Sequence, residues 1–315
     1  MIDILRGYFS ISYWRHTVWS SETAKILLAT TGPLWLLFNL PGYFGVLASW
    51  KPFFQDHLSI YVGLCALTTI IIRHPVTSVS SCLSSRDVAI EVRVGNLFCL
   101  RSASLVVSTN TTFETDTNNG LVAKDSIQGQ FTEQYFDSVS HLDKDLDKDI
   151  DEALKGIHVE EHLQDGRPGK TNRYRIGTVA QVRPMGRTCY LLAVGNITAT
   201  GNCESSFEMV KQALAALWNH VQMKGGIEPI AIGVLGTGRG RLVEKREIVI
   251  REIIESFVAA CASRRFTEKL IVVISPDDYR KHAIDLKDIG MFVRYVCKYT
   301  ELKKPQDKGS GVAVL

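Results

Sequence analysis

Two uncharged apolar runs near the amino terminus restrict the fold of this chain more than any other feature. No charged side chain occurs over residues 26–50 or over residues 58–72, whereas charges are frequent afterwards. At about 1.5 Å of rise per helical residue, the runs reach about 37 Å and about 22 Å. The first is long enough for a hydrocarbon core of roughly 30 Å. The second crosses only if residues nearer Pro52 join it or Arg73 snorkels to the interface.

The two runs predict a transmembrane hairpin over residues 26–72, with spans at about 26–48 and 55–73. Basic residues flank its outer ends, and Lys51 is the basic residue between the spans, so we expect both termini on the cytoplasmic side. The flanking residues are Arg6, Arg15, Lys25, Arg73 and Arg86. The alternatives are a cleaved signal peptide, which usually opens nearer the terminus, and a buried helical pair in a soluble protein.

Composition limits the classes of fold and function that are open to the rest of the chain. With 315 residues, 45% of them hydrophobic, it has enough apolar material for one or two folded units. A net charge of only +3 gives no basic field for nucleic acid. The seven cysteines are scattered, without C-x-x-C pairs, and favour neither disulfides nor a metal site. We expect a cytoplasmic segment 1–25, a Ser-rich linker 73–86, a folded domain 87–300 and a flexible tail 301–315.

The pattern after the linker predicts an α/β sheet with helices on its faces. Residues 88–94 alternate with a period of two, typical of a half-buried strand. Apolar runs predict further strands at 105–107, 190–194, 230–235, 270–274 and 291–296. A capping box at Ser205 and Glu208 opens an amphipathic helix that Gly225 ends. Apolar residues at helical spacing predict a second helix over 250–261.

An acidic segment, residues 143–152, marks a predicted insertion near 137–172. We interpret it as a solvated helix or surface insertion, because it lacks the glycine and terminal glutamate of a calcium loop. The Gly169-Lys170-Thr171 run is not a P-loop, since Gln164 stands where the first glycine is required. The histidines show no metal-ligand spacing, and Trp218 fits a core position on its helix.

One loop suits a diphosphate. A buried strand leads into Gly236, Gly238 and Gly240, whose missing side chains allow the backbone to approach a ligand, and a helix follows. Arg239 and Arg241 add charge suited to phosphate oxygens. The spacing is not the dinucleotide G-x-G-x-x-G motif, and a glycine loop of this kind is as often a plain tight turn.

Two further loops follow strands. Asn110 ends the run 106–110, and Asn196 ends the run 193–196. Loops at the carboxyl ends of strands are where α/β folds bind ligands. Asn110 can donate to and accept from a ribose hydroxyl, although an asparagine beside a turn often satisfies its own backbone.

The ordered segments 94–97, 106–110, 193–196 and 236–240 resemble the ligand-binding segments of macro domains. The resemblance covers roughly residues 86–300 and implies a macro-domain-like, three-layer mixed α/β sheet with flanking helices. With two membrane spans in front, the chain is similar to the macro-domain effectors (ThsA) of type II Thoeris antiphage defence.

This resemblance implies a function. In that family a partner TIR-domain enzyme makes an ADP-ribose-type signal from NAD, a histidine conjugate, which the macro domain senses. The anchored effector, expected at the bacterial inner membrane with its macro domain in the cytoplasm, then assembles as a homo-oligomer and disrupts the lipid bilayer, causing abortive infection. The resemblance implies no cofactor and no nucleic-acid partner. The alternatives are a tethered ADP-ribosyl hydrolase or NAD-derivative-processing enzyme, and an anchoring module with a vestigial pocket.

The resemblance also assigns residues. Asn96 takes the place of an adenine-contacting aspartate, Asn110 matches the ribose-facing asparagine, and residues 236–240 match the diphosphate loop. Gln128 falls near the acid of hydrolytic members, and replacing a carboxylate by an amide removes a general base, which favours sensing over turnover. We therefore predict no catalytic residue. The predicted ligand-binding residues are Asn96, Leu97, Asn110, Gln128, Gly129, Gly195, Asn196, Gly236, Thr237, Gly238, Arg239, Gly240 and Arg241.

Overall fold

The computed structural model of the chain divides into two compact units, residues 1–77 and 78–315. It describes residues 25–33, 36, 58–72, 77–83, 85–136, 145–163, 169–198, 203–236 and 242–300. Residues 1–24 of the predicted amino-terminal segment, the predicted tail 301–315 and the diphosphate-loop residues 237–241 lie outside this description.

The first unit contains the helix α5 (Leu58–Ile72), which is 15 residues long. It coincides with the second uncharged run and exposes Ile60, Val62 and Leu67. Residues 25–33 are also helical, whereas most of the first predicted span lies outside the described residues. Among the residues that the structure describes, no helix has both the length and the apolar character needed to cross a membrane. The hairpin therefore stays a prediction.

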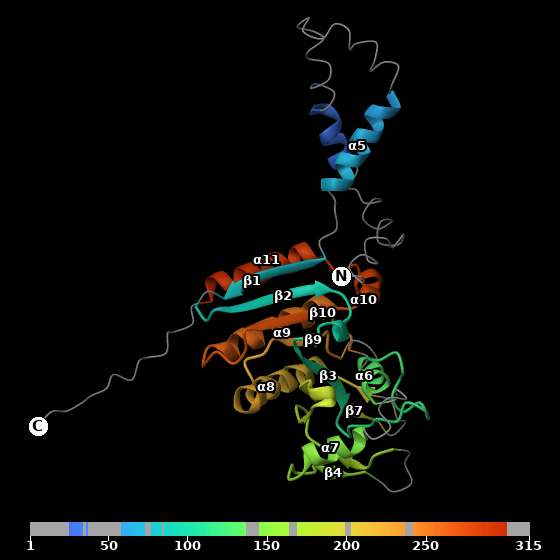
Figure 1. The fold of residues 1–315 in the computed structure, drawn as a ribbon, viewed down its shortest axis with the longest axis vertical. Helices are drawn as coiled ribbons and strands as arrows, with labels where there is room; N and C mark the ends of the chain where they lie inside the picture. The colour runs from blue at the N-terminus through green and yellow to red at the C-terminus, as the bar shows by residue number, and fades with distance from the viewer. Residues whose placement is uncertain are drawn as a thin grey trace, which may run out of the picture. The chain divides into compact units, whose positions relative to one another are not determined.

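The second unit is built on an eight-stranded mixed sheet (Figure 1). Its core is five mutually parallel strands in the order β2, β10, β9, β3, β7, and antiparallel strands β1 and β6 flank them. These strands are β1 (Ser78–Leu83), β2 (Val88–Val94), β3 (Ser104–Asn110), β6 (Val179–Val182), β7 (Cys189–Ile197), β9 (Ile230–Gly233) and β10 (Lys269–Ile274). The short β8 (Cys203–Glu204) pairs with β7, and β4 (Glu161–His162) pairs with β5 (Asn172–Arg173) in a separate hairpin.

Helices cover both faces of the sheet, giving three layers. Leu105 and Val107 of β3 join one buried cluster with side chains of α6 (Ile127–Tyr135) and α7 (Leu146–Leu154), whereas the intervening Val106 points away from that cluster and is also buried. Helix α8 packs against β7 and α9, and α11 packs against β1 and α9. These helices are α8 (Phe207–Lys224), α9 (Arg246–Cys261) and α11 (Leu286–Tyr299). The predicted α/β sheet with flanking helices is confirmed.

Local sequence signals explain most elements. The strands predicted at 88–94, 105–107, 190–194, 230–235 and 270–274 are all present with small shifts in their bounds. Helix α8 begins one residue later than predicted, because the hydroxyl of Ser206, rather than Ser205, accepts a hydrogen bond from the Met209 N–H at 3.2 Å. Trp218 is buried and donates to Ser256 Oγ at 3.0 Å, as expected for a core side chain.

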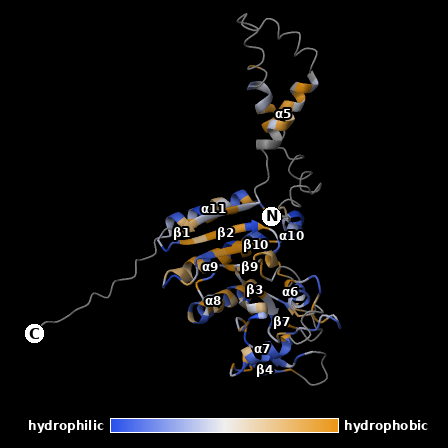
Figure 2. Ribbon diagram, in the orientation of Figure 1, coloured by the Kyte–Doolittle hydropathy of each residue, from blue (hydrophilic) through white to orange (hydrophobic). Residues whose placement is uncertain are grey.

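Two predictions were wrong. Residues 291–296 lie in α11 and not in a strand: Asp285 caps the helix, and the buried Leu286, Ile289 and Val293 are spaced by three and four residues. The predicted linker 73–86 contains β1, an edge strand whose Ser-rich sequence hid its alternating burial. Figure 2 shows that the central strands are hydrophobic, whereas α7 is more hydrophilic.

The acidic segment is an amphipathic helix within the predicted insertion. The Asp145 carboxylate caps α7 by accepting from the Asp147 and Lys148 N–H groups, and Leu146, Ile150 and Leu154 are buried. Because the apolar residues repeat at helical spacing, α7 packs onto the sheet and leaves its carboxylates in solvent. The interpretation of residues 143–152 as a solvated helix is therefore confirmed from residue 145 onward.

Two carboxylates attach this insertion to the loop that follows β3. Asp147 Oδ1 lies 2.6 Å from Lys170 Nζ and accepts from Thr115 Oγ1 at 2.6 Å. Glu114 is 3% exposed, and its carboxylate accepts from the N–H groups of Thr115, Asp116 and Lys170 at 3.0, 3.1 and 2.8 Å. Charged acceptors make such bonds stronger than neutral ones, so they fix the insertion to the loop.

Arg187 organises the segment after β2. Its guanidinium donates to the carbonyls of Ala103 at 2.9 Å, Phe98 at 3.3 Å and Leu100, and to the Tyr135 hydroxyl at 2.7 Å. One side chain thus holds the short 3₁₀ helix η1 (Leu97–Cys99) against α6.

The first prediction concerns Asp147. Burial raises the pKa of its carboxyl, but the hydrogen bonds from Lys170 and Thr115 and the Lys170 charge lower it by more, so the pKa lies below its usual value. Such a group stabilises the fold above its unfolded pKa, and this contribution disappears as pH falls through the folded pKa. At pH 7 we expect Asp147→Asn to lower the unfolding free energy by no more than about 1 kcal/mol, since the pair is half exposed.

Urea denaturation from pH 7 down to about pH 3 measures this effect. The difference between wild type and Asp147→Asn should shrink towards the acid end. Asp149→Asn, on the same helix, makes the same change of charge without removing the Lys170 pair. An equal loss in both variants, or a loss that does not depend on pH, would contradict the assignment.

The second prediction concerns Arg187. We expect Arg187→Met to lower the unfolding free energy by about 2–4 kcal/mol, because three carbonyls and a phenol lose their donor. Thermal denaturation measures the loss. Arg183→Met is the matched control, because Arg183 is exposed four residues earlier, and it should change the midpoint little.

Candidate functional site

A cavity of about 630 Å³ opens at the carboxyl ends of the five parallel strands. Its lining includes Gly95 after β2, Thr109 of β3, Val194 of β7, Gly233 of β9 and Val273 of β10. Parallel strands end at one edge of a sheet, so loops far apart in the sequence meet there. This edge is where ligands bind in open α/β folds.

The cavity brings together five of the predicted ligand residues. The lining contains Asn96, Leu97, Asn110, Gln128 and Gly236. Gly129, Gly195 and Asn196 are not among the lining residues. Residues 237–241, which hold the rest of the predicted diphosphate loop, lie outside the described residues.

Asn96 connects β2 to the 3₁₀ helix. Its side-chain oxygen accepts from the Phe98 N–H at 2.8 Å and so caps η1. The bond orients the side chain, whose amide nitrogen can donate to a ligand and whose oxygen keeps a second lone pair.

Asn110 serves the loop and the cavity through different atoms. Its Oδ1 accepts from Thr112 N at 3.0 Å, Thr112 Oγ1 at 2.9 Å and Glu114 N at 3.2 Å. As asparagines beside turns often do, Asn110 accepts hydrogen bonds from nearby backbone N–H groups. It uses the carbonyl oxygen, so the amide NH₂ is the donor that Asn110 can present to a ligand.

Gln128 and Gly129 form the first turn of α6. Gln128 is 6% exposed, and its Nε2 donates to the Glu114 carbonyl, so its oxygen is the acceptor that can serve the cavity. Gly129 allows close packing: a Cβ there would lie 2.3 Å from the Ala123 carbonyl oxygen. The Ser126 hydroxyl caps the helix by accepting from the Gly129 N–H at 3.0 Å.

Gly195 and Asn196 support the cavity from β7. A Cβ on Gly195 would lie 2.5 Å from Ser205 Oγ and 2.7 Å from Cys203 Sγ, so only glycine lets the chain after β8 approach β7 this closely. Asn196 Oδ1 accepts from Thr111 Oγ1 at 3.1 Å. Gly195 thus positions two lining residues, Ser205 and Cys203, without lining the cavity itself, and Asn196 joins β7 to the residue after β3.

Gly236 lies where β9 gives way to the predicted diphosphate loop. Its φ is +68°, a conformation that favours glycine. Its carbonyl accepts from the Leu242 N–H at 3.2 Å, which fixes both ends of the loop. The backbone at Gly236 is therefore held in this conformation at the wall of the cavity.

Sequence reasoning missed the rim formed by α10 (Pro276–Lys281). The Ser275 hydroxyl caps α10, and Asp278 lies 3.7 Å from Arg246 of α9; both groups line the cavity. The dipeptide Ser275-Pro276, a cap followed by proline in the first turn, was the available signal. Thr109 and Ser205 also line the cavity, although the sequence marked Ser205 only as a helix cap and Thr109 only as a member of the run 106–110.

Cys203 is the thiol in the described cavity lining. Burial raises its pKa to about 11, although the Ser205 hydroxyl acts in the opposite direction. The thiol is therefore protonated at neutral pH and a weak nucleophile. The described residues contain no cluster of three or more His, Cys, Asp or Glu side chains placed to hold a metal ion.

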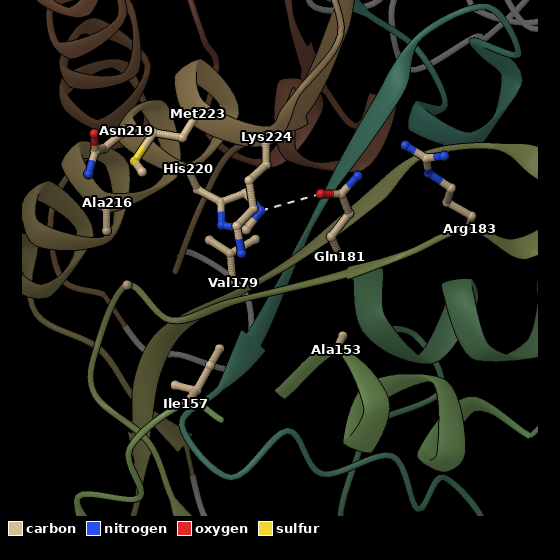
Figure 3. A pocket seen from close by; sticks show the side chains of 11 residues that line it. Ala153, Ile157, Val179, Gln181, Arg183, Ala216, Asn219, His220, Met223 and Lys224 are labelled. Carbon is tan, nitrogen blue, oxygen red and sulfur yellow. Dashed lines mark hydrogen bonds between the residues drawn. The ribbon is translucent and has the colours of Figure 1, made fainter. Parts of the chain in front are cut away.

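A second cavity of about 470 Å³ lies between α8 and β6 (Figure 3). Its His220 points towards Gln181, with Nε2 3.4 Å from the Gln181 Oε1. Burial and the nearby Lys224 charge lower the pKa of His220. None of the predicted ligand residues lines this cavity.

Solved structures with related folds share little sequence with this chain. The Oceanobacillus iheyensis macrodomain with ADP is 13% identical, with a TM-score of 0.44 over 67% of this chain and 97% of that one. The Trypanosoma brucei macrodomain in complex with ADP-ribose is 11% identical, with a TM-score of 0.41 over 64% of this chain and 69% of that one.

A curated relative and a family profile both point to the Thoeris protein ThsA. The Thoeris protein ThsA of Bacillus amyloliquefaciens (strain Y2) is 22% identical over 198 residues, which are 61% of this chain and 64% of that protein. The match thus spans less than two thirds of the relative. The profile of the family described as "Thoeris protein ThsA, Macro domain" matches residues 90–275, more than half of the chain. The chain belongs to the Thoeris protein ThsA, Macro domain family.

Proposed function

We propose that this chain is a membrane-anchored sensor and effector of bacterial antiphage defence whose macro domain binds an ADP-ribose-type nucleotide. The observation that carries the proposal is the cavity at the carboxyl ends of the parallel strands, where Asn96, Asn110 and Gly236 meet. Two solved macrodomain structures support the ligand class, since one contains ADP and the other contains ADP-ribose.

The cavity suits such a ligand chemically. Gly236 lines the cavity at the start of the glycine-rich loop, in a backbone conformation with positive φ that favours glycine. Asn110 can present its amide NH₂ as a donor because three hydrogen bonds occupy its oxygen, and the amide of Asn96 is oriented by the bond from the Phe98 N–H. The volume of about 630 Å³ is within the range of small-molecule sites.

Binding without turnover agrees with the described chemistry. Gln128, at the position where the family resemblance predicts an acid in hydrolytic members, holds the Glu114 carbonyl and cannot act as a general base. Cys203 is protonated at neutral pH. A sensor needs only a ligand that favours one of two states, with signalling following the shift in population.

The proposal also includes the source of the ligand, the anchoring of the chain in a membrane and the assembly of several copies. The signal is made by a TIR-domain partner and is a histidine conjugate of ADP-ribose. The chain sits in the bacterial inner membrane through a hairpin over residues 26–72, with its macro domain in the cytoplasm. Ligand binding promotes homo-oligomer assembly and bilayer disruption, which aborts infection. The uncharged runs and the exposed apolar side chains of α5 support the anchor.

The third prediction tests ligand binding with Asn110→Asp. The substitution keeps an oxygen for the Thr112 and Glu114 bonds but replaces the donor NH₂ by a second, charged oxygen. We expect the affinity for ADP-ribose to fall by about tenfold or more, while the melting temperature of the unliganded protein stays near wild type. Isothermal titration calorimetry measures the affinity.

The control is Asn219→Asp, which makes the same change on α8, where Asn219 lines the second cavity. It should bind ADP-ribose as wild type does. If the folded wild-type protein binds no ADP-ribose derivative at all, the proposed function is wrong.

The fourth prediction tests the anchor. In lysed bacteria, we expect the full-length chain to sediment with the membranes and to resist alkaline carbonate, because two apolar spans would hold it. The fragment 78–315, which is one compact unit, should stay in the supernatant and bind ADP-ribose with unchanged affinity. An intact full-length chain that remains in the supernatant after ultracentrifugation would exclude the anchor.

A further inference from the structure

The second cavity, between α8 and β6, has a lining that two regular spacings produce (Figure 3). Lining residues recur every second position along β6 and directly after it, so they share one face of the strand. On α8 they recur every three or four positions and share one face of the helix. The lining side chains of these two elements that carry a polar atom or a sulfur are Gln181, Arg183, Asn219, His220, Met223 and Lys224.

The charges that line this cavity are positive. The described lining contains Arg183 and Lys224 but no Asp or Glu, and neither cation forms an ion pair with a carboxylate in the part of the chain that the structure describes. His220 is neutral at pH 7, because burial and the Lys224 charge lower its pKa. Two cations at one cavity repel each other and attract an anion. A guanidinium can hold an oxyanion through two parallel hydrogen bonds.

The cavity also exposes apolar surface beside these cations. Ile157, which follows α7, and Met223 of α8 line it and are 37% and 73% exposed. The His220 ring is held in place, since it lies edge-on to Tyr190 with the ring centroids 5.9 Å apart and its Nε2 lies near Gln181. A ligand with a ring of its own would remove this apolar surface from water. The volume of about 470 Å³ is within the range of small-molecule sites.

We propose that this cavity is a second ligand site, which binds a small molecule that joins an oxyanion to an apolar ring. Arg183 and Lys224 bind the oxyanion, and Ile157 and Met223 cover the ring. The site is separate from the cavity at the ends of the parallel strands, because the two described linings share no residue. The inference does not depend on nucleotide binding there.

The experiment uses three probes. Benzenesulfonate carries both the charge and the ring, benzenesulfonamide has nearly the same shape without the charge, and inorganic sulfate has the charge without the ring. The full-length chain has five methionines, so its ¹³C-labelled methionine methyl groups give few NMR signals, and Met223→Leu identifies the signal of Met223. We expect benzenesulfonate to shift this signal saturably, with an affinity about tenfold or more above that of either other probe. Saturating ADP-ribose should leave the shift unchanged.

Four variants locate the charge effect. Arg183→Gln and Lys224→Gln should each lower the affinity for benzenesulfonate about three- to tenfold, and Asn219→Asp, which adds an acid to the lining, should lower it similarly. Arg294→Gln is the matched control, because it removes the same charge from an exposed position on α11. It should leave the affinity for benzenesulfonate unchanged. All four variants should bind ADP-ribose as wild type does.

Each contrary result overturns the inference. The site is excluded if benzenesulfonate does not shift the Met223 signal saturably. Equal affinity for benzenesulfonamide would show that the charge plays no part, and equal affinity for sulfate would show that the ring plays none. An equal loss in Arg294→Gln and Arg183→Gln would make the effect one of overall charge. A failure to bind ADP-ribose in calorimetry would instead exclude the proposed function and leave this second site unaffected.

Discussion

The parallel pairing of β2, β10, β9, β3 and β7 is the constraint on which the rest of this domain depends. Each strand is buried and ends at the same edge of the sheet, so the chain must leave the core at five neighbouring points. The groups that follow these strands meet there although up to about 180 residues separate them in sequence. The cavity is a direct consequence of that edge, and the flanking helices keep the strands in register.

Three amide side chains of the cavity bond to the protein through one end and can bond to a ligand through the other. Asn96, Asn110 and Gln128 each use one end of their amide on nearby backbone. This fixes the orientation of the other end before any ligand arrives, which lowers the ordering cost of binding. An amide suits this double use better than a carboxylate, because its two ends have opposite hydrogen-bonding character.

The sequence predicted the core strands, helix α8 and the loops after β2, β3 and β9, because apolar runs and following polar or glycine residues depend on local spacing. It failed for residues 291–296, where a short apolar run fits a strand or a helix, and for β1, whose serines conceal an edge strand. The packing roles of Gly129 and Gly195 depend on Ala123 and Ser205, which the turns between them bring near and which no spacing rule marks. Thr109 is an ordinary strand residue in sequence.

Glu114 joins two parts of the chain that are far apart in sequence. Its carboxylate is buried and receives one of its three backbone N–H groups from Lys170 in the insertion. Losing the Lys170 N–H would leave the buried carboxylate with one partner fewer, which costs about 1.5–3 kcal/mol. Replacing Glu114 would in turn leave the Lys170 N–H without this acceptor, so the insertion and this buried acid depend on each other for their hydrogen bonds.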